Sequence, residues 1–280
     1  MKLISYVHAG QAAWGAVIDG QVINLARITG LDSLAAFLGS PQFAQRATLV
    51  QGQSPVATLA EVTLLPVIPQ PEKIICVLRN YHDPNAPATE LPAYPPIFLR
   101  TWRSQTAHDA PMVRPRVSTS LDWEGELAVI IGQGGRDIAP ADAYRHVAGY
   151  ACYNDGSVRD WQAHAKQIAA GKNFEATGAF GPWMVTADEI EPGRKLALEV
   201  RLNGEVVQAG HTHQMIFDIP ALIHYASTIV TLAPGDVLVT GTPGGAGFTR
   251  KPPRFLQPGD VCEVEIEGVG LLRNLVVQQA

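Results

Sequence analysis

The chain has 280 residues, of which 46% are hydrophobic and 17% are charged, and its formal net charge is -5. This composition is typical of a globular protein and excludes a largely disordered chain. The negative charge disfavours nucleic acid as a partner, because phosphate binding needs a basic surface. No apolar run approaches the roughly 18 residues of a membrane-spanning helix, so we also expect no membrane partner.

The first 65 residues (1–65) are predicted to form a small N-terminal unit. Residues 2–25 indicate short strands separated by Ala-Gly and Asp-Gly turns. Residues 31–40 then predict a helix that begins after a cap at Asp32 or Ser33. Residues 66–73 contain three prolines and predict a linker, because proline is stiff and fits poorly in regular structure.

Residues 74–280 are predicted to form the main domain, in which strand-like runs outnumber helices. Helices are expected at about 158–168 and 219–230. The strands do not alternate regularly with helices, which disfavours a doubly wound parallel sheet and favours a large mixed β core with a few covering helices. The strand-like runs are KIICVL, PPIFLR, EGELAVIIG, HVAGYACYN, GPWMVT, LALEVRLNGEVV, DVLVTGT and DVCEVEIEGVGLLRNLVV.

The cysteine content indicates a reducing compartment. Cys76, Cys152 and Cys262 are odd in number and far apart, which is typical of structural thiols rather than of a disulfide framework. The first residues, MKLISYVHAG, have too short an apolar stretch for a secretory signal. We therefore expect a cytoplasmic protein.

Two acidic residues in the run LDWEGELAVIIG point to a metal site. Side chains alternate between the faces of a strand, so Glu124 and Glu126 point the same way, and Leu127 begins the opposite, apolar face. Two carboxylates on one face repel each other unless solvent or a cation relieves them. An exposed strand face is the alternative interpretation, but the apolar residues that follow indicate an internal strand.

A third acid, Asp155, follows the aromatic run GYACY and precedes a Gly-Ser turn into a predicted helix. Aspartate is a common turn and helix-cap residue, and that role is an alternative interpretation. Together with Glu124 and Glu126, it would supply three hard oxygen ligands. Such ligands suit Mg²⁺ or Mn²⁺.

The chain from about residue 74 to its end resembles the fumarylacetoacetate hydrolase family. The fold that this resemblance implies is α+β but mainly β, a mixed β-roll or sandwich with a small N-terminal α/β unit. The family is usually dimeric, so a homodimer is expected. The segments that carry the resemblance are DWEGELAVIIG, GYACYNDGSVRDWQ, GKNFEATGAFGPWMVT, LNGEVVQ with THQMIFDIP, LAPGDVLVTGTPGGAGF and LQPGDVCEVEIEGVGLLRN.

The resemblance also implies roles for individual residues. Glu124, Glu126 and Asp155 match the family's metal ligands, with Mg²⁺ or Mn²⁺ as the cofactor. A small oxo-acid is the implied substrate, and Lys172 and Thr242 would orient it. The positions that match substrate contacts of the family are Arg79, Tyr81, Arg100, Gln162, Lys172 and Thr242.

The chain departs from the family where the hydrolases activate water. The family has a Gly before its Arg-Asn-Tyr segment, and then a His and a Glu that act as the base. Here the aligned positions hold Leu78, Pro84 and Pro87. Proline has no side-chain base, so the usual general base cannot come from these positions.

Three nearby residues could replace this base: His82, Asp83 or Glu90. Histidine is the best candidate by its chemistry, although a solvated loop histidine is the alternative interpretation of His82.

These observations lead to three alternative hypotheses for the function. The main hypothesis is metal-dependent hydrolysis of a C–C bond in an acylpyruvate-like or other β-dicarbonyl acid. Its close alternative is an isomerase, tautomerase or decarboxylase of an oxo-dicarboxylic acid, which uses the same metal and needs no water-activating pair. The third is an inactive family member that binds a metabolite.

Overall fold

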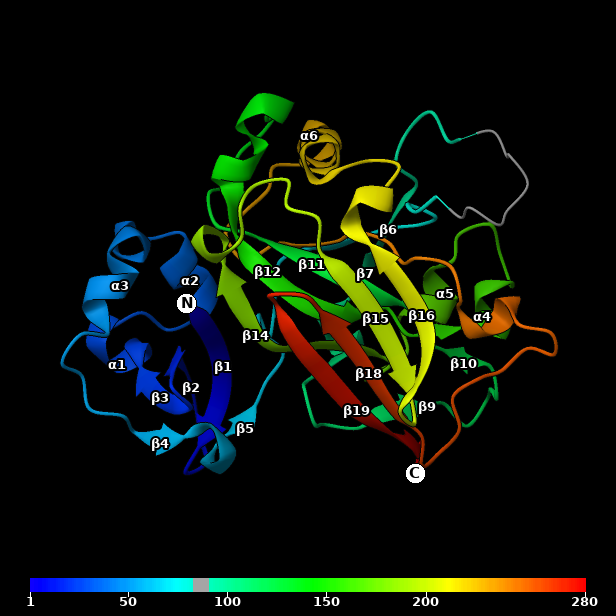
Figure 1. Cartoon of the computed structure of the whole chain (residues 1–280), viewed down its shortest axis with the longest axis horizontal. Helices are drawn as coiled ribbons and strands as arrows, with labels where there is room; N and C mark the ends of the chain where they lie inside the picture. Colours follow the sequence, from blue (N-terminus) through cyan, green and yellow to red (C-terminus); the bar gives the residue numbers. More distant parts are fainter. Residues whose placement is uncertain (83–90) are drawn as a thin grey trace.

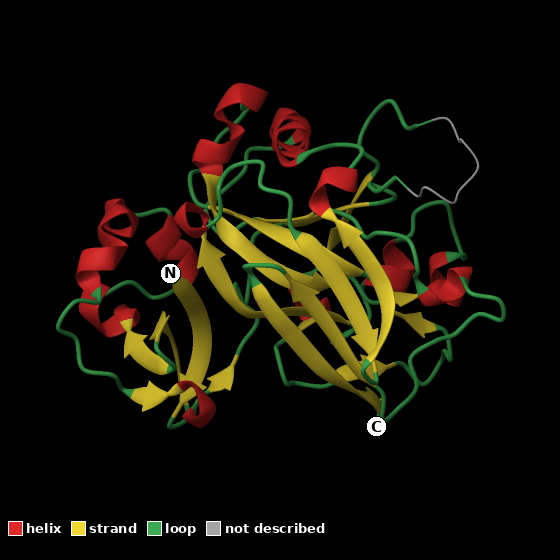
Figure 2. Cartoon of the chain, viewed as in Figure 1, coloured by secondary structure: helices red, strands yellow, loops and turns green. Residues whose placement is uncertain are grey.

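The computed structural model describes residues 1–82 and 91–280. The chain is built mainly from β-strands in two large sheets, and Figures 1 and 2 show that the short helices lie around the rim of these sheets. The mainly β fold with mixed sheets that the sequence predicts is confirmed. Pro84 and Pro87 lie outside the described residues, as do Asp83 and Glu90.

The larger sheet has twelve strands among the described residues and runs through the N-terminal unit and the main domain. Most neighbours are antiparallel, whereas β17–β6 and β14–β8 are parallel. Its spatial order is β4 (Ala57–Thr58), β3 (Gln21–Asn24), β2 (Gln11–Ile18), β1 (Lys2–His8), β14 (Gly178–Thr186), β12 (Val147–Asn154), β11 (Gly125–Ile131), β17 (Val237–Val239), β6 (Ile74–Val77) and β7 (Ile97–Arg100), with β5 (Thr63–Leu64) beside β1 and β8 (Gln105–Thr106) beside β14.

Two smaller sheets complete the β structure. The second sheet lies in front of the larger one in Figure 1 and ends in a parallel pair, β19–β9. Its order is β16 (Glu205–His211), β15 (Ala197–Leu202), β18 (Val261–Ile266), β19 (Gly270–Gln278) and β9 (Met112–Arg114). The third sheet is a two-stranded pair, β10 (Leu121–Asp122) with β13 (Ser157–Val158).

The helices are short. The α-helices are α1 (Leu25–Thr29), α2 (Leu34–Leu38), α3 (Arg46–Leu49), α4 (Arg159–Gln162), α5 (Ala169–Lys172) and α6 (Ile219–Ile229). The 3₁₀ helices span Pro41–Gln45, Leu59–Glu61, Trp102–Ser104, Pro140–His146, Ala187–Glu189, Thr212–Gln214 and Gly247–Thr249.

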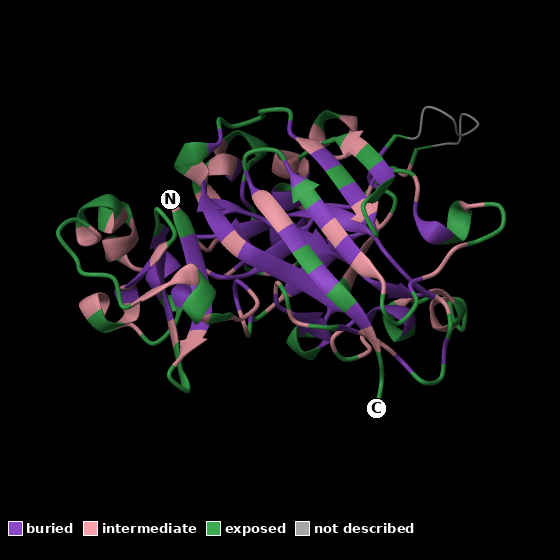
Figure 3. Cartoon of the chain, turned by 60° about the horizontal axis from the view of Figure 1, so that its bottom comes forward, coloured by how far each residue is buried: buried purple, intermediate pink, exposed green. Residues whose placement is uncertain are grey.

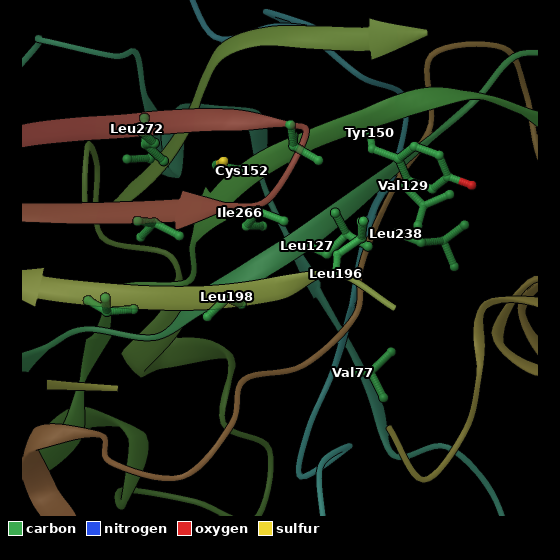
Figure 4. Packing of buried hydrophobic residues seen from close by; sticks show 14 of the residues in the cluster. Val77, Leu127, Val129, Tyr150, Cys152, Leu196, Leu198, Leu238, Ile266 and Leu272 are labelled. Carbon is green, nitrogen blue, oxygen red and sulfur yellow. The ribbon is translucent and has the colours of Figure 1, made fainter. Parts of the chain in front are cut away.

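The central strand β11 is buried on both faces, as Figure 3 shows for most of the large sheet. Leu127 and Val129 pack against the second sheet, in the layer that Figure 4 shows with Leu198 and Ile266. Ala128 and Ile130, on the opposite face, belong to a second core that includes residues of the N-terminal unit. A strand that is buried on both faces needs a continuous apolar run, and β11 has one.

The N-terminal unit is joined to the main domain through the larger sheet. β1 pairs with β14, where Lys2 lies opposite Val185. The predicted linker, residues 66–73, contains neither helix nor strand. The division into an N-terminal unit (1–65), a linker (66–73) and a main domain (74–280) remains a prediction.

Two of the three predicted helices are confirmed, and the third is wrong. α2 begins after Ser33, whose side chain accepts the N–H of Ala36, and α6 matches the helix predicted at 219–230. The single helix predicted at 158–168 is wrong, because the chain turns back between α4 and α5. An unbroken helix would carry Lys172 about 20 Å along its axis from residue 159. The turn instead brings Lys172 back beside α4.

The cysteines are all free and buried, as predicted for structural thiols. No helix in the described part of the chain has the length and apolar content needed to cross a membrane.

The first testable prediction concerns the start of α6, where the exposed carboxylate of Asp218 accepts the N–H of Ala221 at 2.9 Å. Asp218→Ala removes this cap and is expected to lower the free energy of unfolding by about 1 kcal/mol in urea denaturation. Asp218→Asn is the matched control, because asparagine also caps helices. Equal losses in both variants would contradict the capping role.

Candidate metal centre

Three buried carboxylates converge at the beginning of β11. Glu124 and Glu126 flank Gly125, and Asp155 follows β12, the neighbouring strand. One oxygen from each carboxylate lies within 4.8 Å of the other two. The backbone N–H of Asp155 donates to the Glu124 carbonyl at 2.8 Å, which continues the β11–β12 pairing and keeps the acids together.

Lys172 enters this cluster from α5 and is completely buried. Its Nζ donates to Glu124 Oε2 at 2.7 Å, to Asp155 Oδ2 at 2.6 Å and to the Asp155 carbonyl at 3.3 Å. Burial alone lowers the pKa of Lys172, but Asp155 and Glu124 raise it above its ordinary value. The ammonium therefore stays charged. α5 packs against α4 closely, since a Cβ on Gly171 would lie 2.6 Å from the Gln162 Cβ.

Arg100, at the end of β7, holds Asp155 from the other side. Its Nη1 lies 2.5 Å from Asp155 Oδ1 and 3.0 Å from the carbonyl of Gly156. The remaining guanidinium donors bond to Ser104 and Thr177. All five donors of Arg100 are thus directed to protein acceptors, so this predicted substrate contact faces a carboxylate of the cluster.

Two further residues, Asp122 and Arg159, belong to the site but were missed in the sequence. Arg159 Nη2 donates to Glu124 Oε1 at 2.6 Å, and its Nε donates to Asp122 Oδ2 at 2.8 Å. The short β10–β13 pair brings the two residues together. A signal was available, because Asp122, Glu124 and Glu126 are spaced two apart and Arg159 follows Asp155 by four.

The pKa values of Glu124 and Glu126 are shifted in opposite directions by their surroundings. Burial raises the pKa of Glu124, but the nearby charges of Arg159 and Lys172 outweigh it and hold the pKa below its ordinary value. For Glu126, burial and the neighbouring carboxylates of Asp155 and Glu124 raise the pKa well above its ordinary value. Glu126 Oε2 accepts the backbone N–H of Gly241 at 2.5 Å, and no ion pair to Glu126 forms among the described residues.

Thr242 and Gln162 lie beside the cluster and are half-buried. The Thr242 hydroxyl donates to the Gly125 carbonyl at 2.8 Å and accepts from Gln208 at 3.0 Å. Its hydrogen is therefore directed to the protein. The Gln162 side-chain carbonyl accepts from Arg159 Nη1 at 3.0 Å.

The segment from residue 79 to 82 lies at the end of β17, because the Asn80 amide donates to the Thr240 carbonyl at 2.8 Å. Tyr81 is buried, and its hydroxyl has no hydrogen-bond partner among residues 1–82 and 91–280. Arg79 and His82 are exposed, and the backbone of His82 donates to Gln214. The structure thus gathers the acids, Lys172 and Arg100, and leaves Arg79 and His82 at the surface.

The residues fit a divalent cation. One oxygen from each of the three carboxylates lies within 4.8 Å of the other two, and carboxylate oxygens are the ligands that Mg²⁺ and Mn²⁺ prefer. Each oxygen of Glu124 already accepts one bond but retains a second lone pair. Glu126 is a buried acid without a cationic partner among the described residues, which a metal ion would supply.

Comparisons with known proteins show which family this chain belongs to. The family model "Fumarylacetoacetate (FAA) hydrolase C-terminal" matches residues 73–277. Human "Oxaloacetate tautomerase FAHD2A, mitochondrial" is 43% identical over 268 residues, which cover 92% of this chain and 84% of the relative.

Solved structures match along the full chain. A fumarylacetoacetate hydrolase from psychrophilic Exiguobacterium antarcticum has a TM-score of 0.84 and 34% identity, with 100% of both chains covered. Maleylpyruvate hydrolase from Sphingobium sp. SYK-6, in complex with manganese(II) and pyruvate, has a TM-score of 0.84 and 28% identity, also with 100% of both chains covered. This chain therefore belongs to the fumarylacetoacetate hydrolase family and is an enzyme.

Proposed function

We propose that this enzyme is a divalent-metal-dependent tautomerase that interconverts the enol and keto forms of a small 2-oxo dicarboxylic acid such as oxaloacetate. The observation that carries the proposal is the buried Lys172 ammonium, which bridges two acids of a three-carboxylate cluster. The tautomerase relatives favour this reaction over C–C hydrolysis, the main hypothesis from the sequence.

The metal would be held by Glu124, Glu126 and Asp155. When bound there, Mg²⁺ or Mn²⁺ supplies positive charge that stabilises negative charge developing on the substrate oxygen. The relative with manganese and pyruvate supports a divalent cation in this family, and the choice between the two metals remains a prediction.

The reaction needs no water. In the enol-to-keto direction the O–H bond breaks and its electrons form the second bond of the C=O group, while the π electrons of the C=C bond form the new C–H bond at the neighbouring carbon. No atom is gained or lost. The loss of the family's water-activating pair at Pro84 and Pro87 is therefore compatible with tautomerisation, whereas hydrolysis would need a replacement base.

Lys172 is the residue that would act at the substrate oxygen. Two of its donors form short bonds to Glu124 and Asp155, whereas the third reaches the Asp155 carbonyl at 3.3 Å. We expect the N–H group that forms this longest bond to donate to the substrate oxygen instead. A fixed ammonium in a buried site stabilises an enolate more strongly than one in water.

Other residues would bind and position the substrate. His82 is the candidate that moves the proton at carbon, because Asn80 anchors its segment beside Thr240. Gln162, Thr242, Arg79 and Tyr81 remain predicted substrate contacts. Arg100 would act through Asp155, since all its donors face the protein. A homodimer and a cytoplasmic location also remain predictions.

The test follows the loss of enol absorbance of oxaloacetate and of a panel of acylpyruvates, with Mg²⁺ or Mn²⁺ and then with EDTA. We expect faster conversion of enol to keto oxaloacetate that EDTA abolishes, without release of CO₂. Metal-dependent release of pyruvate and a carboxylic acid from an acylpyruvate, with no effect on oxaloacetate, would instead establish the hydrolase.

The metal ligands are tested by Glu126→Gln. Glutamine has the shape of the protonated acid, so the variant is expected to be as stable as the wild type without metal. Saturating Mn²⁺ at a hundred times its Kd should stabilise the wild type by about 2.7 kcal/mol and the variant not at all. Thermal unfolding with and without Mn²⁺ measures this difference.

Glu175→Gln is the matched control, because Glu175 is exposed outside the cluster and should keep the response to Mn²⁺. A full response to Mn²⁺ in Glu126→Gln would rule out Glu126 as a ligand.

Lys172→Met separates metal binding from catalysis. Methionine fills a similar volume without charge, and the two carboxylates lose a competing cation. We expect Mn²⁺ to bind at least as tightly, while kcat falls by about 100-fold or more because a donor to the developing enolate is lost. Calorimetric titration and the enol assay measure these quantities.

Lys166→Met serves as the control for Lys172→Met, since Lys166 is exposed in the turn between α4 and α5. An unchanged kcat in Lys172→Met would contradict the role of Lys172.

A further inference from the structure

Asp122 is a fully buried carboxylate that accepts four hydrogen bonds. Its Oδ1 accepts the backbone N–H of Trp123 at 2.9 Å and of Gly247 at 2.8 Å. Its Oδ2 accepts the backbone N–H of Phe248 at 3.1 Å and Nε of Arg159 at 2.8 Å. One side chain therefore binds a loop and the arginine that contacts Glu124.

The guanidinium of Arg159 has three further contacts. Nη2 donates to Glu124, Nη1 donates to Gln162, and the carbon at its centre lies 4.2 Å from the centroid of the Phe248 ring. The bond from Nε to Asp122 fixes the plane of the group, because the donors of a guanidinium have a rigid geometry. The position of the Asp122 carboxylate thus sets where Arg159 meets Glu124 and Gln162.

The loop around Phe248 is held in the same way. Gly247 has no room for a side chain, since a Cβ would lie 1.9 Å from the Arg254 carbonyl and 2.5 Å from Asp122 Oδ1. The Phe248 ring is 49% exposed, yet its backbone bonds to Asp122 and its ring lies against Arg159. An exposed aromatic side chain that is held this firmly is suited to form the wall of a binding site.

We propose that Asp122 is a positioning residue, which clamps the loop at residues 247–248 to Arg159 and thereby orients Glu124 for the metal and Phe248 for the substrate. The inference rests on the proposed function, because it assigns Glu124 and Phe248 to the same metal and substrate site. Asp122 itself touches neither ligand. Partners that orient metal ligands affect both metal affinity and activity.

Asp122→Asn is the sharpest variant. One of its two side-chain atoms becomes an NH₂ group, which would face two N–H donors wherever the amide points. The size of the side chain is unchanged, so the fold has little steric reason to change. Asp19→Asn is the matched control, because it removes one exposed negative charge in the N-terminal unit.

We expect Asp122→Asn to weaken Mn²⁺ binding about tenfold and to raise the KM for enol oxaloacetate about tenfold. Phe248→Ala should raise KM and leave Mn²⁺ affinity unchanged, since it keeps the backbone N–H. The double variant should show less than the product of the two KM effects, because both substitutions disturb one contact.

The proposal would be overturned if Asp122→Asn folds with a lowered Tm but keeps its Mn²⁺ affinity and its KM. It would also be overturned if the two substitutions affect KM independently in the double variant. If Asp122→Asn does not fold, Phe248→Ala decides, and an unchanged KM overturns the proposal. Absence of turnover in the wild type would instead count against the tautomerase. In that case Mn²⁺ titration of Asp122→Asn would test the positioning role of Asp122, and an unchanged Mn²⁺ affinity would overturn that role.

Discussion

The structure depends on the balance of buried charge around the start of β11. Four carboxylates and three cations lie together there among the described residues, and all are buried except the half-buried Arg159: Asp122, Glu124, Glu126 and Asp155 against Arg100, Arg159 and Lys172. Buried charges are costly unless they are paired and hydrogen-bonded, so each cation is held by at least one acid. The surplus acid is Glu126, whose pKa is raised by burial and then by the neighbouring carboxylates of Asp155 and Glu124. A divalent cation would remove the surplus.

The fold supplies each charge from a different element. β11 and β12 bring the acids together, β7 brings Arg100, and the turn between α4 and α5 returns Lys172. The apolar faces of β11 are covered on both sides, which excludes water from the strand that carries Glu126. Low water access strengthens every electrostatic interaction in the cluster. The site therefore depends on the sandwich of sheets as much as on its own side chains.

The proposed chemistry is consistent with the sequence at Leu78, Pro84 and Pro87. A hydrolase must activate water, and the positions that we predict to align with the family's water-activating pair hold prolines. A tautomerase moves only a proton, so a cation, an ammonium and a proton carrier are enough. The segments that resemble the family include the cluster residues, whereas the predicted departures from it are Leu78, Pro84 and Pro87. The relatives named as oxaloacetate tautomerases agree with this division.

The elements whose signals are local could be predicted from the amino-acid sequence. The apolar runs predicted β11, β12 and the other main strands, the Ser33 cap and the helix at 219–230 followed from their neighbours, and the two-residue spacing of Glu124 and Glu126 predicted a shared face. The distant charge pairs and the break between α4 and α5 could be seen only in the tertiary structure. Asp122 and Arg159 are 37 residues apart, and Arg100 and Asp155 are 55 apart, so no local pattern records these pairs. The break between α4 and α5 was also missed, because it depends on close packing at Gly171 and on two distant acids that attract Lys172. Local periodicity specifies which face of an element is apolar, whereas long-range packing and charge pairing decide what that face meets.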